Sequence, residues 1–202
     1  MRTLRLSLLT PSLFAFLACG GAPEPCATGD CAEAPADAGA NPIDDPADDG
    51  ADAGPPALVP VGASEHDLGG GWIGAGQPSE ARLREVVEAG ARVISLRYPE
   101  EDPFNEEAVV DELGGVFIRY PTQGSSYQDV SFRQGMYDLY DAQAAEGGLV
   151  YLHCASSNRV GASWALYQAE RKGVPAEEAI ALGKQAGLAS LESMVRDILG
   201  VP

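Results

Sequence analysis

The chain has 202 residues and a formal net charge of −17, from 13 lysines and arginines against 30 acidic residues. This length allows one domain with a hydrophobic core, together with additional segments. The acidity lies in residues 20–202, which have no basic stripe or patch, and this argues against nucleic acid as a partner. An anionic ligand therefore has to be bound by a local site and not by the surface as a whole.

Residues 1–19 resemble a bacterial export signal. Arg2 and Arg5 precede an apolar run from Leu6 to Ala18, which is too short to cross a bilayer as a folded helix. Cys19 follows a small residue, as the lipid-carrying cysteine of a lipoprotein signal does. We expect an exported protein, periplasmic, at the outer membrane or extracellular, held to a membrane by a lipid on Cys19. A soluble secreted protein cut just before this cysteine is the alternative.

Residues 20–57 are expected to form a disordered tether. Ala, Pro, Gly and Asp fill 30 of the 37 positions in 20–56, which also hold nine acids and no base. Such a segment buries too little apolar surface to offset its ordering entropy, and its like charges extend it. Cys26 and Cys31 lie in this tether and either form a small disulfide outside the cytosol or remain free thiols.

Residues 58–202 alternate strand and helix patterns. In chain order we expect a short edge strand at 71–76, a helix at 80–89 capped by Ser79, a strand at 91–97, a helix opened by Asn105, a strand at 115–121, a loop at 122–129 and a helix at 131–146. Inward positions on that last helix are expected to be Phe132, Met136, Leu139, Tyr140 and Ala144.

The rest of the chain begins with the most apolar strand, at 148–153, which is expected in the centre of a sheet. A helix at 160–172, a helix started by Pro175 and a last helix capped by Ser190 follow. This order predicts an α/β fold: a mainly parallel central sheet flanked by helices, with a helical C-terminal part. Ligands of such sheets bind at the carboxyl ends of the strands, where Cys154 lies.

The segment from Cys154 to Arg159 joins a strand to a helix N-terminus, where unpaired N–H groups and the helix dipole favour an anion. A thiolate is stabilised in that position. The Arg159 guanidinium can hold two oxygens of a phosphate while the sulfur attacks phosphorus. The alternative, an inert buried thiol, is disfavoured by the accompanying arginine.

The sequence "LHCASSNRVGA" resembles the active-site loop of the cysteine-dependent, dual-specificity-like phosphatases, and it is most similar to the phosphatase-like domain of beta-lactamase hydrolase-like proteins. "GQPS" (76–79), "ISLR" (94–97) and "WALY" (164–167) are further marks of that resemblance, which covers roughly residues 70–200. It implies a phosphoester hydrolase that forms a phosphocysteine, needs no cofactor or metal, and acts on a phosphorylated small molecule or a phosphoprotein.

The resemblance also implies roles for individual residues. Cys154 would be the nucleophile and Arg159 the phosphate clamp, with Asp129 as the acid that protonates the leaving group. Asp129 has a second interpretation, as the residue that starts the following helix. The remaining substrate-binding positions implied are those that adjust the cysteine, supply N–H donors or follow the arginine: His153, Ala155, Ser156, Ser157, Asn158 and Val160.

Three features depart from the general phosphatase pattern. Four residues separate Cys154 from Arg159 where five are usual, and this shorter ring is also found in rhodanese sulfurtransferases. Val160 stands where many phosphatases have a hydroxyl residue. Ser157 stands where a glycine is expected, which costs stability if φ is positive there. A rhodanese-like sulfurtransferase or persulfide-handling protein, and a non-catalytic anion-binding lipoprotein, therefore stay open.

Other chemistry-bearing residues are assigned structural roles. Arg97 ends its strand on the side of Cys154, and we expect it to pair with Glu100 or Glu101. His66 is expected at the surface, and with only two histidines a zinc site is not expected. Core packing is expected for three tyrosines: Tyr137, Tyr140 and Tyr151.

Overall fold

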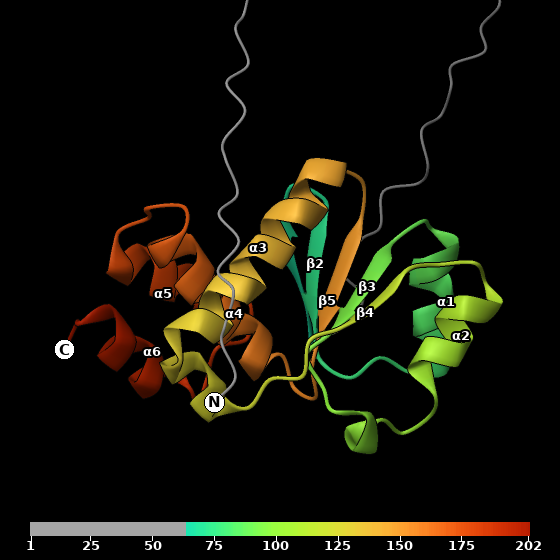
Figure 1. Cartoon of the computed structure of the whole chain (residues 1–202), viewed down its shortest axis with the longest axis horizontal. Coiled ribbons are helices and arrows are strands. Elements are labelled where there is room, and N and C mark those ends of the chain that lie inside the picture. The colour runs from blue at the N-terminus through green and yellow to red at the C-terminus, as the bar shows by residue number, and fades with distance from the viewer. Residues whose placement is uncertain (1–63) are drawn as a thin grey trace, which may run out of the picture. The chain divides into compact units, whose positions relative to one another are not determined.

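The computed structural model describes residues 64–202 (Figure 1). The expectations for the export signal, for lipidation of Cys19 and for the tether with Cys26 and Cys31 lie outside the described residues. The strands are β1 (Glu65–Gly69), β2 (Trp72–Ala75), β3 (Arg92–Ser95), β4 (Phe117–Arg119) and β5 (Val150–His153). Across the described part, no helix has the length and apolar character needed to cross a membrane.

The five strands form one sheet in the order β1-β2-β5-β3-β4. β1 and β2 pair antiparallel, and the other three pairings are parallel, which confirms the mainly parallel sheet. β5 is central, as its apolar sequence predicts. The expectation that 71–76 forms an edge strand is wrong, because β1 pairs with β2 on its outer side. The hairpin between them turns through Gly69, Gly70 and Gly71, all with positive φ.

Helices cover both faces of the sheet (Figure 1). They are α1 (Glu80–Glu88), α2 (Glu106–Glu112), α3 (Val130–Glu146), α4 (Asn158–Glu170), α5 (Ala176–Gln185) and α6 (Glu192–Leu199), with 3-10 turns η1 (Pro99–Glu101) and η2 (Gly124–Gln128). One core lies between the sheet and α1 and α2, and the other lies between the sheet and the remaining helices. The α/β fold class, with its helical C-terminal part, is thereby confirmed.

Side-chain caps explain where several helices begin. Ser79 accepts from the Arg82 N–H at the start of α1, and Asn105 accepts from Ala108 N–H at the start of α2, both as predicted. The expected cap at Ser190 is wrong, because α6 begins one residue later with Leu191 at the cap position. The Ser190 hydroxyl instead accepts a hydrogen bond from the amide of Asn158.

The inward face of α3 differs in part from the expected stripe. Met136 and Tyr140 are buried as predicted, together with Tyr137. Ala144 is exposed, and Gln143 occupies the buried position in its turn, where its side-chain oxygen accepts from Arg92. A pattern of apolar residues does not predict the burial of Gln143, because this residue is polar and its partner comes from a distant part of the chain. The tyrosines Tyr137, Tyr140 and Tyr151 are in the core, as expected.

Candidate active site

The loop that carries the cysteine leaves the central strand at the carboxyl edge of the sheet. β5 ends at His153 and α4 begins at Asn158, so the loop residues between them are Cys154, Ala155, Ser156 and Ser157. Cys154 N–H donates to the Ala75 carbonyl across 3.1 Å, and Gln77 N–H donates to the Ala155 carbonyl across 3.1 Å. The segment after β2, which includes the "GQPS" motif, therefore supports the cysteine loop from one side.

Ser157 adopts a left-handed backbone conformation, with φ of 64° and ψ of −12°. Among the described residues it is the one non-glycine residue with positive φ. Its hydroxyl donates to the Ser64 carbonyl across 2.8 Å, and the residue is 1% exposed. The sequence-based concern about a serine at this position is therefore justified: the turn needs a positive φ, and a side-chain hydrogen bond offsets part of the cost.

Cys154 is completely buried. Burial raises the pKa of Tyr127 and of Tyr140, and the charge of Cys154 adds to both shifts. The charge of Cys154 also contributes to the raised pKa of Arg159. Because the side chain is completely buried, a ligand can reach the sulfur only after the groups that cover it move.

Arg159 is held by several acceptors at once. Its Nη1 donates to the main-chain carbonyls of Leu96, at 3.1 Å, and Thr122, at 3.0 Å. Glu101 accepts from both ends of the fork, with Nη2 to Oε2 at 2.6 Å and Nη1 to Oε1 at 3.3 Å. Burial lowers the pKa of Arg159, but the hydrogen bond that Arg159 donates to Glu101 and the charge of Cys154 outweigh this effect, so the net shift of the pKa is upward. The guanidinium is therefore charged and oriented.

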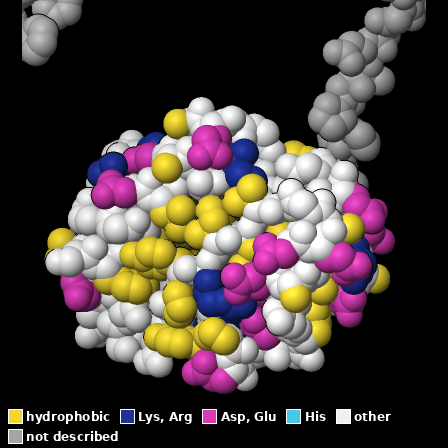
Figure 2. All heavy atoms as spheres, turned by 45° about the vertical axis from the view of Figure 1, so that its right-hand side comes forward, with side chains coloured by type: hydrophobic (Ala, Val, Ile, Leu, Met, Phe, Trp, Pro, Cys, Tyr) yellow, Lys and Arg dark blue, Asp and Glu magenta, His cyan; other side chains and the backbone are white. Residues whose placement is uncertain are grey.

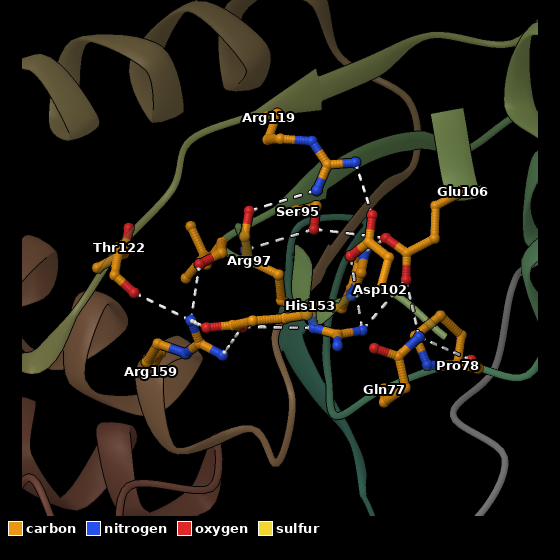
Figure 3. A network of polar contacts seen from close by, with 12 residues as sticks. Gln77, Pro78, Ser95, Arg97, Asp102, Glu106, Arg119, Thr122, His153 and Arg159 are labelled. Carbon is orange, nitrogen blue, oxygen red and sulfur yellow. Dashed lines mark hydrogen bonds and ion pairs between the residues drawn. The ribbon is translucent and has the colours of Figure 1, made fainter. Parts of the chain in front are cut away.

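A second arginine, Arg97, lies close to the same carboxylate (Figure 3). Its Nε is 3.5 Å from Glu101 Oε2, and its Nη1 is 3.7 Å from Asp102 Oδ1 and 3.5 Å from Glu106 Oε1. The expected pairing of Arg97 with Glu101 is confirmed, and two further carboxylates join it. Arg119 in turn donates to Asp102 across 2.8 Å.

His153 precedes the cysteine and is fully buried against Glu106, with Nε2 3.3 Å from Oε2. Gln77 donates to the other carboxylate oxygen across 2.7 Å. Burial by itself raises the pKa of Glu106, but the contact and charge of His153, together with Gln77 and Arg97, lower it below its ordinary value. An ionised carboxylate therefore lies next to His153, the residue before the cysteine.

The remaining candidate residues are distributed around this centre. Asn158 uses its side chain to join α4 to the segment before α6, donating to Ser190 and accepting from Ala189 N–H. Val160 is buried in the core, while Ala155 and Ser156 are exposed. The first N–H groups of α4, beginning at Asn158, have no partner within the helix. They remain available to an anion above the loop.

Asp129 is the N-terminal cap of α3. Its Oδ1 accepts from Ser131 N–H across 2.8 Å and from Phe132 N–H across 3.3 Å. The helix-starting interpretation of this residue is therefore correct. Its assignment as the acid that protonates a leaving group stays a prediction.

Charges of opposite sign lie side by side on the face drawn in Figure 2. Each small group of basic side chains there adjoins acidic ones, and no continuous basic area is seen. This agrees with the overall acidity of the chain.

No protein-family model and no curated protein matches the chain. Solved structures do match. Tk-PTP in its active form has a TM-score of 0.56 with 20% identity, over 67% of this chain and 95% of its own. The chain has a protein-tyrosine-phosphatase-like fold. TpbA of P. aeruginosa, in complex with pTyr, matches this phosphatase-like domain with a TM-score of 0.52 and 14% identity, over 72% and 97% of the two chains. PTPMT1 in complex with PI(5)P matches with a TM-score of 0.54 and 18% identity, over 68% of this chain and 96% of its own.

Sequence patterns do not identify three residues of the candidate site. Glu101 binds Arg159, Glu106 lies against His153, and Tyr127 donates to the Arg159 carbonyl across 2.7 Å. The sequence suggests only a pairing of Glu101 with Arg97. Glu106 has the pattern of an ordinary acid in the first turn of a helix. For Tyr127, the sequence offers one indication of such a role: a large aromatic side chain in a polar loop, which is expected to pack against a buried partner.

Proposed function

We propose that the chain is a cysteine-dependent phosphoester hydrolase. The observation that carries the proposal is the placement of Cys154 directly after the central strand β5 and of Arg159 in the first turn of α4. The similarity of the fold to solved tyrosine phosphatases supports it. A nucleophilic sulfur, a guanidinium fork and free N–H groups are the parts that phosphoryl transfer through cysteine requires.

In the proposed reaction the Cys154 thiolate attacks phosphorus and a sulfur–phosphorus bond forms. The bond between phosphorus and the leaving oxygen breaks, and that oxygen takes a proton. Water then attacks the phosphocysteine, the sulfur–phosphorus bond breaks, and inorganic phosphate leaves with the thiolate restored. Arg159 and the first N–H groups of α4 stabilise the charge on the phosphoryl oxygens.

The proposed substrate is a phosphorylated small molecule or a phosphoprotein. Among the similar structures, TpbA holds pTyr and PTPMT1 holds PI(5)P, so the fold accommodates both kinds of ligand in those proteins. For this chain, a panel of aryl, alkyl and peptide phosphates would rank the classes. Release of inorganic phosphate is the measurement, since it does not depend on the leaving group.

Cys154→Ser is the decisive variant. It should abolish release of phosphate from a small aryl phosphate, and Arg159→Lys should reduce it by at least about 100-fold, because the bidentate contact is lost. Arg171→Lys is a matched control, since Arg171 is at the other end of the same helix and pairs with Asp138 and Asp141. Activity that survives in Cys154→Ser would exclude the mechanism.

The four-residue spacing between Cys154 and Arg159 favours one alternative, a rhodanese-like sulfurtransferase. Intact-mass analysis separates the two functions. Exposure to an aryl phosphate leaves a phosphoryl adduct on a phosphatase, whereas thiosulfate leaves a persulfide on a sulfurtransferase. Neither adduct should form on Cys154→Ser, which controls for the other cysteines. A protein that binds phosphate but forms no adduct would be a non-catalytic anion binder.

We also propose that the domain is exported and attached to a membrane through a lipid on Cys19. The support is the sequence before this residue, with two arginines and an apolar run. Metabolic labelling with a radioactive fatty acid should mark the wild-type protein and not Cys19→Ala. Labelling of neither, with a soluble mature protein beginning near residue 19, would favour simple secretion.

A further inference from the structure

A carboxylate of the protein itself occupies a position between the two arginines of the site. Glu101 Oε2 is 2.6 Å from Arg159 Nη2 and 3.5 Å from Arg97 Nε. Glu101 belongs to η1, a short turn at the carboxyl edge of the sheet, and its side chain is 35% exposed. One anionic oxygen thus lies within reach of two guanidinium groups, at a position open to solvent.

Arg97 is unusual for a buried arginine because two of its nitrogens have no hydrogen-bond acceptor. The residue is 5% exposed, and its Nε and Nη1 make no hydrogen bond although three carboxylates lie within 4 Å. Buried donors are normally satisfied, and an unsatisfied one indicates a missing partner. Nε is 3.5 Å from the same oxygen that Arg159 holds, so we place the missing partner at the position of Glu101.

Glu101 is one of several charged groups gathered at the site. Arg97, Arg119 and Arg159 face three carboxylates, those of Glu101, Asp102 and Glu106. Asp102 and Glu106 are buried with side-chain exposures of 6% and 0%. Glu101 is the exposed member and is attached to a short turn. Its departure would remove one negative charge from beside Arg97 and Arg159, which favours an anionic ligand there.

We propose that Arg97 is a second phosphate-binding arginine and that Glu101 holds the place of a ligand oxygen until the ligand arrives. An incoming phosphate displaces the Glu101 carboxylate from Arg159 and gives Arg97 Nε the close acceptor it lacks. The proposal rests on the proposed function only in taking phosphate as the anion.

Calorimetric titration of the folded protein with inorganic phosphate tests the proposal. Glu101→Gln removes the competing charge and should bind phosphate about tenfold more tightly than wild type. Glu100→Gln is the matched control: it removes the same charge from the same turn, and Glu100 is exposed. The phosphate affinity of Glu100→Gln should differ from that of wild type by less than about twofold, because a surface charge is screened by salt.

Arg97→Lys, made in the Glu101→Gln protein, tests the second arginine. It keeps the positive charge but lacks the planar fork, and most of the tenfold gain should disappear. Circular dichroism confirms that each variant is folded, and Glu101→Gln remains a test by itself if Arg97→Lys unfolds. Equal or weaker phosphate binding by Glu101→Gln would show that Glu101 only orients Arg159, and would overturn the proposal.

The binding measurement is independent of turnover. Should wild type fail to hydrolyse any phosphoester while Glu101→Gln binds phosphate more tightly, the proposed function fails and the assignment of Arg97 and Glu101 stands. The reverse result, turnover by wild type with no gain in binding by Glu101→Gln, removes the assignment and leaves the function intact.

Discussion

The Tyr127 hydroxyl donates a hydrogen bond to the main-chain carbonyl of Arg159 across 2.7 Å, so η2 is joined directly to the first turn of α4. Tyr127 is fully buried, and its own carbonyl accepts from Arg133 across 2.6 Å. Arg133 then pairs with Glu170 near the end of α4. One polar chain therefore connects both ends of α4 to the segment that precedes α3.

Tyr127→Phe removes the hydroxyl and keeps the ring. We expect a loss of about 1 kcal/mol in the free energy of unfolding, the usual net value of one hydrogen bond. Because that bond positions the turn that carries Arg159, KM for an aryl phosphate should rise more than kcat falls. Urea unfolding and steady-state kinetics provide the two measurements. Tyr127→Ala should lose about 3–5 kcal/mol through the cavity it leaves. Equal losses in the two variants would contradict this account.

Ser157 balances a strained backbone against a hydrogen bond, and two substitutions separate these contributions. Ser157→Gly removes the strain of the left-handed conformation, which stabilises the folded state by about 1–2 kcal/mol. It also loses the hydrogen bond to Ser64, which costs about 1 kcal/mol. The two effects nearly cancel, so the stability of this variant should stay near that of wild type. Ser157→Ala keeps the strain and loses the bond, and it should be less stable than the glycine variant by at least about 1 kcal/mol. Denaturant midpoints at unchanged m-value decide the order.

Asp129 has one observed role and one proposed role, and asparagine distinguishes them. Asn caps helices as well as Asp does but cannot give up a proton in catalysis. If Asp129 is the general acid, Asp129→Asn should retain stability and lose about 100-fold or more in kcat for an alkyl phosphate. Asp129→Ala should in addition lose about 1 kcal/mol of stability. Full activity in Asp129→Asn would limit this residue to capping α3.

Glu106 should make stability depend on pH in the acid range. Its pKa is lowered below 4.5 in the folded state, so its contribution is fully present above pH 4.5 and is lost as pH falls through the folded-state pKa. Glu106→Gln lacks this contribution and leaves His153 and Arg97 without their carboxylate. It should be about 3 kcal/mol less stable at neutral pH, and the difference should shrink in acid. Parallel curves of unfolding free energy against pH for the two proteins would contradict this.

Most strands could be located from the sequence because their apolar side chains recur along short β-branched runs, as in the segment that becomes β5. β1 could not, since "EHDLG" is mostly polar and pairs on only one side. Its existence depends on the glycine turn and on contacts with the cysteine loop. Similarly, Ser190 has the features of a helix cap, but its hydroxyl is taken by Asn158 from another helix.

The chemistry of the site was predictable where it is local. Cys154 and Arg159 lie five positions apart between a strand and a helix, so one turn of chain brings them together. Glu101, Glu106 and Tyr127 approach from separate segments, and only the tertiary fold shows that they touch this turn. The sequence could not show that the cysteine is buried either, since that depends on the side chains that cover it.

Ser64, the first described residue, contributes one carbonyl oxygen to two contacts: Ser157 Oγ at 2.8 Å and Gly76 N–H at 2.9 Å. The Ser64 carbonyl thereby joins the start of the described domain to the strained turn at Ser157 and to the residue after β2. A change that displaces Ser64 would therefore reach the cysteine loop directly, through a single main-chain oxygen.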